Sequence, residues 1–264
     1  MVDHSIEVHN LTVAYDRAPV LWDADFTLPK GQIIGVIGPN GSGKTTLLKT
    51  IMGLIKPASG FVKIFDKKLD DIREKVAYVP QRETVDWDFP ASVMDIVLMG
   101  RYRKSNLFKR LTKTDKEIAL SAIEKVKLTP FKNRQISQLS GGQQQRVFIA
   151  RALAQGADLY LMDEPFVGVD ASTETAILDL LVELKKQGKT VIIIHHDLQT
   201  VSEYFDHIVL LNTRLIASGP TNEVLTNENL KNAYGGQLTM LSKITEIIKE
   251  KEFPIREKGF EENS

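Results

Sequence analysis

The sequence Gly38-Pro39-Asn40-Gly41-Ser42-Gly43-Lys44-Thr45-Thr46 stands between an apolar run, 33–37, and a helical pattern, 47–52. Glycines at this spacing before a Lys-Thr pair, between a strand and a helix, are typical of a phosphate-binding loop. The glycines permit positive φ, which turns backbone N–H groups toward a polyphosphate, and the following helix adds the positive end of its dipole. We expect Lys44 to meet the β- and γ-phosphates and the Thr45 hydroxyl to bind Mg²⁺. A tight connection without a ligand is the alternative.

Length and composition narrow the classes of protein to consider. A chain of 264 residues suits one large domain, or one domain with a lobe. Its 34 basic and 34 acidic side chains balance, so no overall field draws it to nucleic acid or an anionic membrane. The absence of cysteine excludes disulfides and thiolate metal sites, and fits a reducing cytosol. The N-terminus does not resemble a signal peptide, and no apolar run approaches the roughly 18 residues of a spanning helix.

Hydrophobic periodicity predicts an α/β fold. Strands and helices alternate after residue 157, which indicates a parallel sheet with helices on both faces. Residues 91–135 hold two helical patterns without a strand and suggest an inserted lobe; Thr114 and Glu117 have capping-box spacing at the second. After about residue 240, Lys, Glu and Ile alternate as in a solvated helix and tail. The expected strands are 6–15, 20–28, 61–65, 76–79, 158–162, 190–194 and 207–211, and the later helices start near 140, 173 and 197.

Two carboxylates, Asp163 and Glu164, follow the apolar strand 159–162. The carboxyl ends of parallel strands meet at one edge of a sheet, where the phosphate loop also lies. Asp163 can therefore hold Mg²⁺, since hard cations bound with phosphates take one or two carboxylates. Pro165 disfavours the right-handed helical region for Glu164, so we expect an extended backbone there and a carboxylate that accepts a proton from water. Two surface acids at a strand end are the alternative.

Three further segments carry candidate polar side chains. His195 and His196 follow the strand 190–194, and alternation along a strand lets only one of them reach the nucleotide. A transition-metal site at His-His-Asp is disfavoured, because opposed side chains are poor joint ligands. Gln81 follows another strand and is a plausible contact for water or Mg²⁺, or else an ordinary surface residue. Ser140-Gly141-Gly142-Gln143 is either a second phosphate cradle or simply a capped helix start.

These motifs, in this order, resemble those of the ATP-binding-cassette ATPases over roughly residues 6–235. The resemblance implies a RecA-like P-loop core with a mostly parallel sheet, an N-terminal antiparallel β subdomain and an inserted α-helical subdomain. The implied ATPase domain is 1–239, with its core at 1–90 and 156–239 and its helical subdomain at about 91–155; the tail is 240–264. We expect a head-to-tail homodimer in which residues 38–46 of one chain and 139–143 of the other hold each ATP with its Mg²⁺.

The resemblance also implies roles for individual residues. Tyr15 stacks on adenine, although a half-buried strand aromatic is its ordinary interpretation. Glu164 is the general base, His196 contacts the γ-phosphate, and Asp170 lies across the dimer seam. Lys44 and Gln81 assist catalysis, and Thr45, Gln81 and Asp163 bind the Mg²⁺. His195 occupies a position that varies in the wider family and receives no chemical role.

A narrower likeness is to the ATPase subunits of bacterial importers for manganese, zinc or iron, and most to the manganese members. Such importers combine two ATPase chains, at the cytoplasmic face of the membrane, with two permease chains and an extracellular metal-binding lipoprotein. Gln81 and residues 82–110 would transmit motion to the permease, so replacing Trp87 or Phe89 should uncouple transport from hydrolysis. The segments that carry the likeness are 78–82, 85–90, 99–101, 164–170 and 195–197.

Two other functions remain open on the sequence alone. Residues 101–116 contain seven basic side chains and one acid, so a cassette ATPase acting on DNA or ribosomes is conceivable. A lobe that lies against anionic lipid headgroups would explain the same positive charge. The sequence has neither the coiled-coil insertion of DNA-repair cassettes nor the second cassette of ribosome-associated ones, so no nucleic-acid partner is expected. A nucleotide-binding regulatory domain without turnover is the other alternative.

Overall fold

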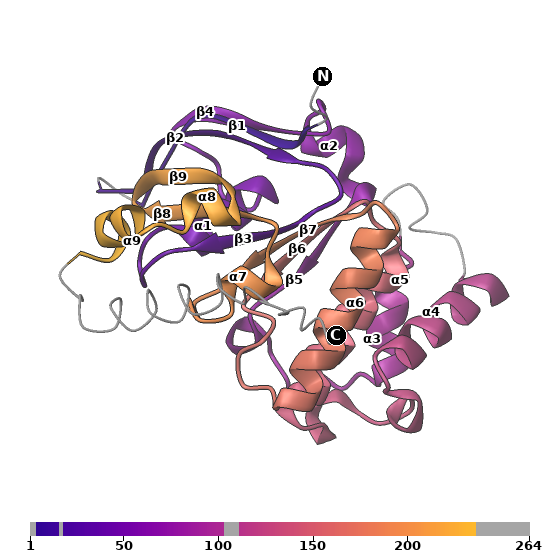
Figure 1. Cartoon of the computed structure of the whole chain (residues 1–264). Helices are drawn as coiled ribbons and strands as arrows, with labels where there is room; N and C mark the ends of the chain where they lie inside the picture. The colour runs from indigo at the N-terminus through magenta and orange to yellow at the C-terminus, as the bar shows by residue number, and fades with distance from the viewer. Residues whose placement is uncertain (1–3, 16–17, 103–110, 236–264) are drawn as a thin grey trace, which may run out of the picture.

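A computed structural model describes residues 4–15, 18–102 and 111–235 (Figure 1). The sequence predicts a turn at residues 16–19; residues 16 and 17 lie outside these ranges, whereas Ala18 and Pro19 begin the second strand. Residues 103–110 of the basic segment 101–116, and the tail, also lie outside them. The strands are β1 (His4–Tyr15), β2 (Ala18–Pro29), β3 (Ile33–Ile37), β4 (Ser59–Ile64), β5 (Val76–Val79), β6 (Leu159–Asp163), β7 (Thr190–Ile194), β8 (His207–Asn212) and β9 (Arg214–Pro220). The α-helices are α1 (Lys44–Ile51), α2 (Leu69–Ile72), α3 (Val93–Met99), α4 (Lys113–Lys125), α5 (Gly141–Gln155), α6 (Ala171–Lys186), α7 (Val201–Tyr204), α8 (Thr221–Val224) and α9 (Asn227–Tyr234).

A six-stranded sheet forms the centre of the molecule, in the order β5-β6-β7-β3-β8-β9. All neighbours pair in parallel except β8 and β9, which form an antiparallel hairpin at one edge. The predicted α/β class with a mostly parallel sheet is confirmed. Strand β9 was not predicted, because its half-buried side chains give little contrast between its two faces. The phosphate loop leaves β3, which lies between β7 and β8.

The apolar runs of the central strands supply two hydrophobic cores at once. Along β3, Ile34 and Val36 enter one core, whereas Ile33 and Ile37 enter the other. Strands β6 and β7 divide in the same way, since successive side chains point to opposite faces of a sheet. Each run is therefore apolar throughout because both faces of the sheet are covered.

A second, antiparallel sheet packs over one face of the first. Its strands run β2-β1-β4, and alternate side chains of β1 and β2 join α1 in one core. Figure 1 shows this sheet as the indigo layer at the top, with α1 between it and β3. The predicted antiparallel subdomain is confirmed, and it places the end of β1 and the start of β2 near the phosphate loop.

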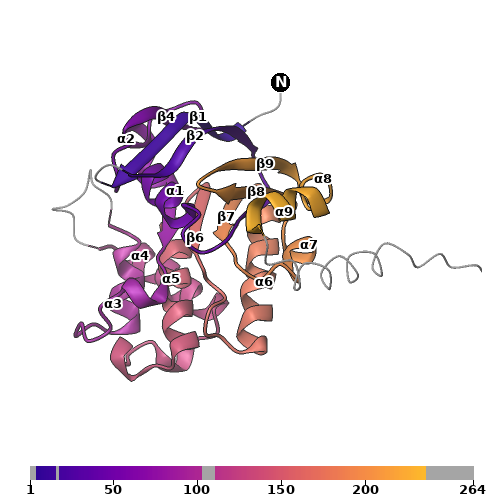
Figure 2. The same cartoon turned by 90° about the vertical axis from the view of Figure 1, so that its left-hand side faces the viewer.

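Helices α3, α4, α5 and α6 cover the opposite side (Figure 2). Helix α4 begins two residues earlier than expected: Thr112 is the N-cap, its hydroxyl accepts the Asp115 N–H at 3.2 Å, and the Thr114 capping box was a wrong prediction. Asp115 takes the place in the capping box that was expected for Glu117, because its carboxylate also accepts a hydrogen bond from Arg101 at 3.0 Å. The boundaries expected for the helical subdomain and the tail stay predictions.

Candidate functional site

The phosphate loop has the backbone that its glycines predict. Gly38, Gly41 and Gly43 all have positive φ, of 152°, 79° and 97°. A Cβ on Gly38 would lie 2.1 Å from the Leu211 carbonyl oxygen of β8, and one on Gly43 would lie 2.8 Å from the Val20 carbonyl oxygen. No larger residue fits at these two positions without moving the backbone. Because β8 and β2 press on the loop from both sides, its N–H groups are held in one arrangement.

Lys44 lies at the start of α1 and is 7 % exposed. Its ammonium donates to the carbonyl oxygens of Gly38, at 2.9 Å, and Pro39, at 2.8 Å. Burial lowers the pKa of Lys44, and the carboxylates of Glu164 and Asp163 partly oppose that effect. The ammonium therefore spans the loop on the side where a bound triphosphate would replace the carbonyls as its partner.

Thr45 and Asp163 meet at the edge of the sheet, as expected from the ends of β3 and β6. The Thr45 hydroxyl donates to Asp163 Oδ1 at 3.4 Å. Burial, followed by the charge of Glu164, raises the pKa of Asp163 to about 6. A divalent cation would offset both effects, and a hydroxyl beside a carboxylate is a suitable pair of oxygen ligands for Mg²⁺. These residues therefore fit the ion that the phosphate loop implies.

Glu164 and Gln81 meet across the ends of β6 and β5. The Gln81 amide donates to Glu164 Oε2 at 3.1 Å and to the exposed Glu83 at 3.1 Å. The expectation of an extended backbone at Glu164 was wrong, since its φ is 51°. The chain turns sharply after β6, with the Val167 N–H bonding the Glu164 carbonyl at 3.3 Å, and the residue adopts a left-handed conformation despite its proline neighbour.

One cavity of about 400 Å³ joins Lys44 and Thr45 to Gln81 and Glu164, whereas Asp163 is not part of its lining. It is bounded by the phosphate loop from Asn40 to Thr46, together with Val20, Gln81 and Glu164. Val20 was not singled out from the sequence, where it reads as an ordinary strand residue. The hydroxyl of Ser42 is buried without a hydrogen-bond partner in this protein, so the loop has unused polar capacity for a ligand. Tyr15 does not border the cavity; it is 51 % exposed at the end of β1.

The Ser140 cradle lies on a different part of the surface, at the start of α5. Ser140 is the N-cap, and it exchanges hydrogen bonds with Gln143 in a capping box. A Cβ on Gly142 would be 3.8 Å from Val169, so this helix start lies beside the start of α6, where Asp170 is the N-cap. The Ser172 hydroxyl, followed by the Thr173 backbone N–H, lowers the pKa of Asp170 to about 2 by donating to its carboxylate. Neither the Ser140 cradle nor Asp170 borders the cavity of its own chain.

The two histidines after β7 differ in environment, although they lie beyond the strand and their ring centroids are only 5.9 Å apart, so they do not point in opposite directions as alternation predicted. His195 is 3 % exposed and packs against Phe166, Tyr204 and Phe205, whereas His196 is exposed. Burial, followed by the charge of His196, lowers the pKa of His195 to about 4, with Asp197 opposing the shift. The buried ring is therefore neutral at pH 7.

This burial predicts a loss of stability in mild acid. Between pH 6.5 and about 4 the unfolded chain binds a proton at residue 195 that the folded chain does not, so the free energy of unfolding falls as the pH falls. At pH 5 the cost is about 2 kcal/mol, and it is negligible at pH 7.5. Urea unfolding of the wild type and of His195→Gln at both pH values measures it. The difference between the two proteins should change by this amount; an equal pH dependence would contradict the prediction.

Comparison with known proteins adds independent information. The family described as ABC transporter matches residues 21–167. A manganese transport system ATP-binding protein of Bacillus subtilis (strain 168) is 58% identical over 236 residues, which cover 89% of this chain and 94% of that protein. A zinc transport system ATP-binding protein of Treponema pallidum (strain Nichols) is 56% identical over 236 residues, or 89% of each chain.

Solved structures resemble the fold as well. A nucleotide-free ATP-binding cassette from an ABC transporter has a TM-score of 0.74 and 27% identity, covering 93% of this chain and 98% of its own. A dimeric ATP-binding cassette in a post-hydrolysis state, bound to ADP and Pi, has a TM-score of 0.71 and 29% identity, covering 81% and 98%.

Proposed function

The chain belongs to the ABC transporter family, and from this premise we propose that it is the ATP-hydrolysing subunit of a bacterial importer for divalent metal ions. The observation that carries the catalytic part is the cavity shared by the phosphate loop, Gln81 and Glu164. A carboxylate at 3.1 Å from an amide that can orient water, beside a triphosphate cradle, suits in-line attack of water on a γ-phosphate.

The residues that line the cavity, together with Asp163, Tyr15 and His196 outside its lining, have separate tasks in the proposed reaction. Glu164 accepts the proton of the attacking water, and Gln81 holds that carboxylate and the water in line. Lys44 and the N–H groups of the loop stabilise the negative charge that develops on the γ-phosphate and its leaving oxygen. Thr45, Asp163 and Gln81 would hold the Mg²⁺, which when bound neutralises phosphate charge. Tyr15 stacks on the adenine, and His196 contacts the γ-phosphate.

Dimerisation gives the Ser140 cradle its ligand. The cradle does not border the cavity of its own chain, yet its N-cap serine and paired glycines can receive an anion at a helix start. In a head-to-tail homodimer, residues 139–143 of one protomer close over the ATP of the other, with Asp170 at the seam beside them. The dimeric, ADP-bound cassette of similar fold supports this arrangement.

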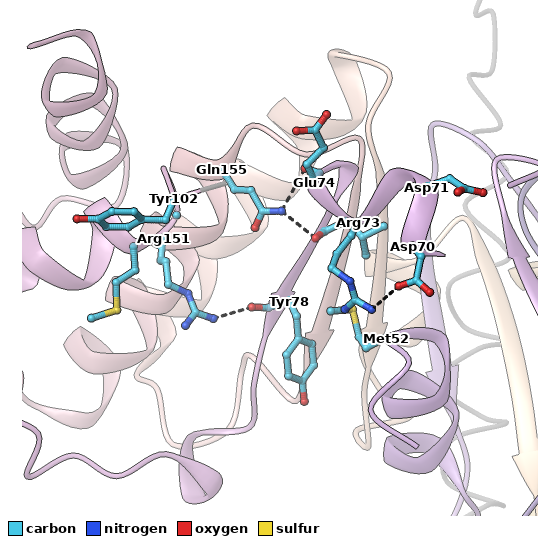
Figure 3. A pocket seen from close by; sticks show the side chains of 12 residues that line it. Met52, Asp70, Asp71, Arg73, Glu74, Tyr78, Tyr102, Arg151 and Gln155 are labelled. Carbon is cyan, nitrogen blue, oxygen red and sulfur yellow. Dashed lines mark hydrogen bonds and ion pairs between the residues drawn. The ribbon is translucent and has the colours of Figure 1, made fainter. Parts of the chain in front are cut away.

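The permease contact is a groove of about 720 Å³ between the central sheet and the helical layer (Figure 3). Its wall includes the side chains of Met99 and Tyr102, which are 43 % and 54 % exposed. Arg151 reaches across its floor to the Tyr78 carbonyl oxygen, at 2.9 Å, and stacks on Phe148. We propose that a cytoplasmic segment of a separate permease fills this groove, because its rim carries exposed apolar and aromatic side chains. No helix of the described ranges is long and apolar enough to span a bilayer.

Tyr102→Glu should therefore weaken permease binding by about tenfold or more, since exposed aromatics of this kind are frequent interface anchors. ATP hydrolysis by the isolated chain should stay within about twofold of the wild type, because Tyr102 does not border the cavity. Phe61→Glu, at an aromatic of similar exposure on the outer sheet, is the control. Co-purification with the permease measures the effect; equal recovery of both variants would contradict the proposed contact.

The two aromatic residues that follow Gln81, Trp87 and Phe89, differ in burial. Trp87 is half-buried: it packs edge-on against Phe148 and donates to the Arg82 carbonyl oxygen at 2.9 Å. Phe89 is 52 % exposed. Uncoupling of transport from hydrolysis is therefore tested most cleanly by Phe89→Ala, because Trp87 also holds the helical layer to this segment.

Manganese is the cargo that we propose, with zinc or iron as the alternatives. The support is the high identity to the manganese and zinc proteins. The residues of this chain do not select the metal, because the ion itself would pass through the permease and an extracellular lipoprotein. Uptake of radioactive manganese and zinc by cells with and without the chain decides between them. A nucleic-acid role gains little support from the described part of the basic segment, where Arg101 is paired with Asp115 and also bonds the Ala154 carbonyl oxygen.

A further inference from the structure

The buried His195 forms a closed set of contacts that the mechanism above does not use. Its Nε2 lies 2.7 Å from the Thr200 hydroxyl, and that hydroxyl lies 3.2 Å from the Asp197 carbonyl oxygen. A hydroxyl has one hydrogen, and a carbonyl can only accept. Thr200 therefore donates to Asp197 and accepts from His195, which places the imidazole proton on Nε2.

The Thr200 hydroxyl does not cap the helix that it precedes. Thr200 is the N-cap of α7, yet its side chain makes no capping bond to the helix. Its polar capacity is used instead on His195 and Asp197, the residues that flank His196. The backbone of His195 is held as well, since its N–H bonds the Val36 carbonyl oxygen of β3 at 3.1 Å. Hydrogen bonds therefore hold the chain on both sides of His196, at His195 and at Asp197.

The His195 ring also faces the segment that carries the catalytic base. Phe166, two residues after Glu164, meets His195 edge-on, with ring centroids 5.6 Å apart and planes at 88°. Tyr204 contacts both rings and donates to Glu174 of α6 at 3.0 Å. The buried imidazole therefore stands between the chain that presents Glu164 and the loop that presents His196.

We propose that His195 is a positioning residue for His196: through its Nε2–H bond to Thr200 and its contact with Phe166, it sets where His196 meets the γ-phosphate. The inference rests on the proposed function, in which His196 has that contact. Positioning of His196 would affect the preference for ATP over ADP, because a displaced His196 loses its contact with the γ-phosphate, which only ATP has. Affinity for ATP should fall while affinity for ADP is kept.

Thr200→Val and Thr200→Ser make a matched test, since valine keeps the shape and serine keeps the hydroxyl. In a Glu164→Gln background that prevents turnover, the dissociation constants of Mg-ATP and Mg-ADP are measured by calorimetry. We expect Thr200→Val to weaken ATP binding about tenfold and ADP binding less than twofold, with Thr200→Ser unchanged. His195→Phe, which fills the aromatic site without a donor, should behave as Thr200→Val. The double variant should lose no more than either single one.

Two outcomes would overturn the proposal. An unchanged ATP-to-ADP ratio in Thr200→Val and His195→Phe would exclude positioning of His196, and an equal loss for both nucleotides would show a purely structural role. His196→Ala separates the inference from its premise. If that variant loses selectivity while Thr200→Val does not, only the inference fails; if His196→Ala keeps its selectivity, the γ-phosphate role of His196 fails and the inference with it.

Discussion

Glu164→Gln is expected to reduce ATP hydrolysis by about 10² to 10⁴-fold while ATP binding is retained. The glutamine side chain has nearly the same shape, and its oxygen can still accept from the Gln81 amide, which lies 3.1 Å from Glu164 in the wild type. It cannot take a proton from water, so the loss falls on turnover. Phosphate release at saturating ATP and calorimetric binding measure the two quantities separately.

Glu83→Gln is the matched control for that substitution. Glu83 accepts from the same Gln81 amide, also at 3.1 Å, but it is exposed and does not border the cavity. Its turnover should stay within about threefold of the wild type. A Glu164→Gln protein with more than a tenth of wild-type turnover would remove Glu164 from the role of base. A wild type without turnover would instead favour the regulatory nucleotide-binding domain.

Lys44→Ala is expected to weaken nucleotide binding by about 10²-fold or more and to abolish turnover. The substitution removes the buried ammonium that faces the phosphates, and with it a positive charge that interacts with Asp163 and Glu164. At 100 times the wild-type Kd, ATP should stabilise the wild type by about 2.7 kcal/mol and the variant by about 0.4 kcal/mol or less. Thermal unfolding with and without Mg-ATP measures this difference.

Lys56→Ala provides the comparison, because Lys56 is exposed beyond the end of α1. It should keep both the stabilisation by ATP and the turnover. Equal turnover in Lys44→Ala and the wild type would be incompatible with the whole catalytic proposal, since no other cation borders the cavity among the residues that the structure describes.

Local chemistry explains why much of the site can be predicted from the order of its residues. Gly38 and Gly43 have positive φ because only glycine tolerates both that backbone and the close carbonyl oxygens of β8 and β2. Ser140 caps α5 because its hydroxyl lies three residues before the N–H that it accepts. The positive φ of the loop and the cap of α5 depend on a few consecutive residues, so spacing alone reveals them, whereas the close carbonyl oxygens of β8 and β2 come from distant parts of the chain.

Other predictions failed where a contact outside the local motif outweighs the local preference. The cap of α4 is Thr112 and not Thr114, since Arg101 favours the earlier box by bonding Asp115. Glu164 has a φ of 51° because the turn after β6 outweighs the local preference that Pro165 imposes. Strand β9 was missed because its pairing with β8, more than its own pattern, makes it a strand.

The sequence by itself determined the phosphate loop, the alternation of strands and helices, and the order of the polar motifs, because periodicity and turn chemistry act over short stretches. Only the tertiary structure decided that Gln81 meets Glu164, that Thr45 meets Asp163, and that His195 is enclosed by Phe166, Tyr204 and Phe205. Those contacts join residues that are up to 118 positions apart, and they exist because burial of two apolar cores fixes the strand order of the sheet.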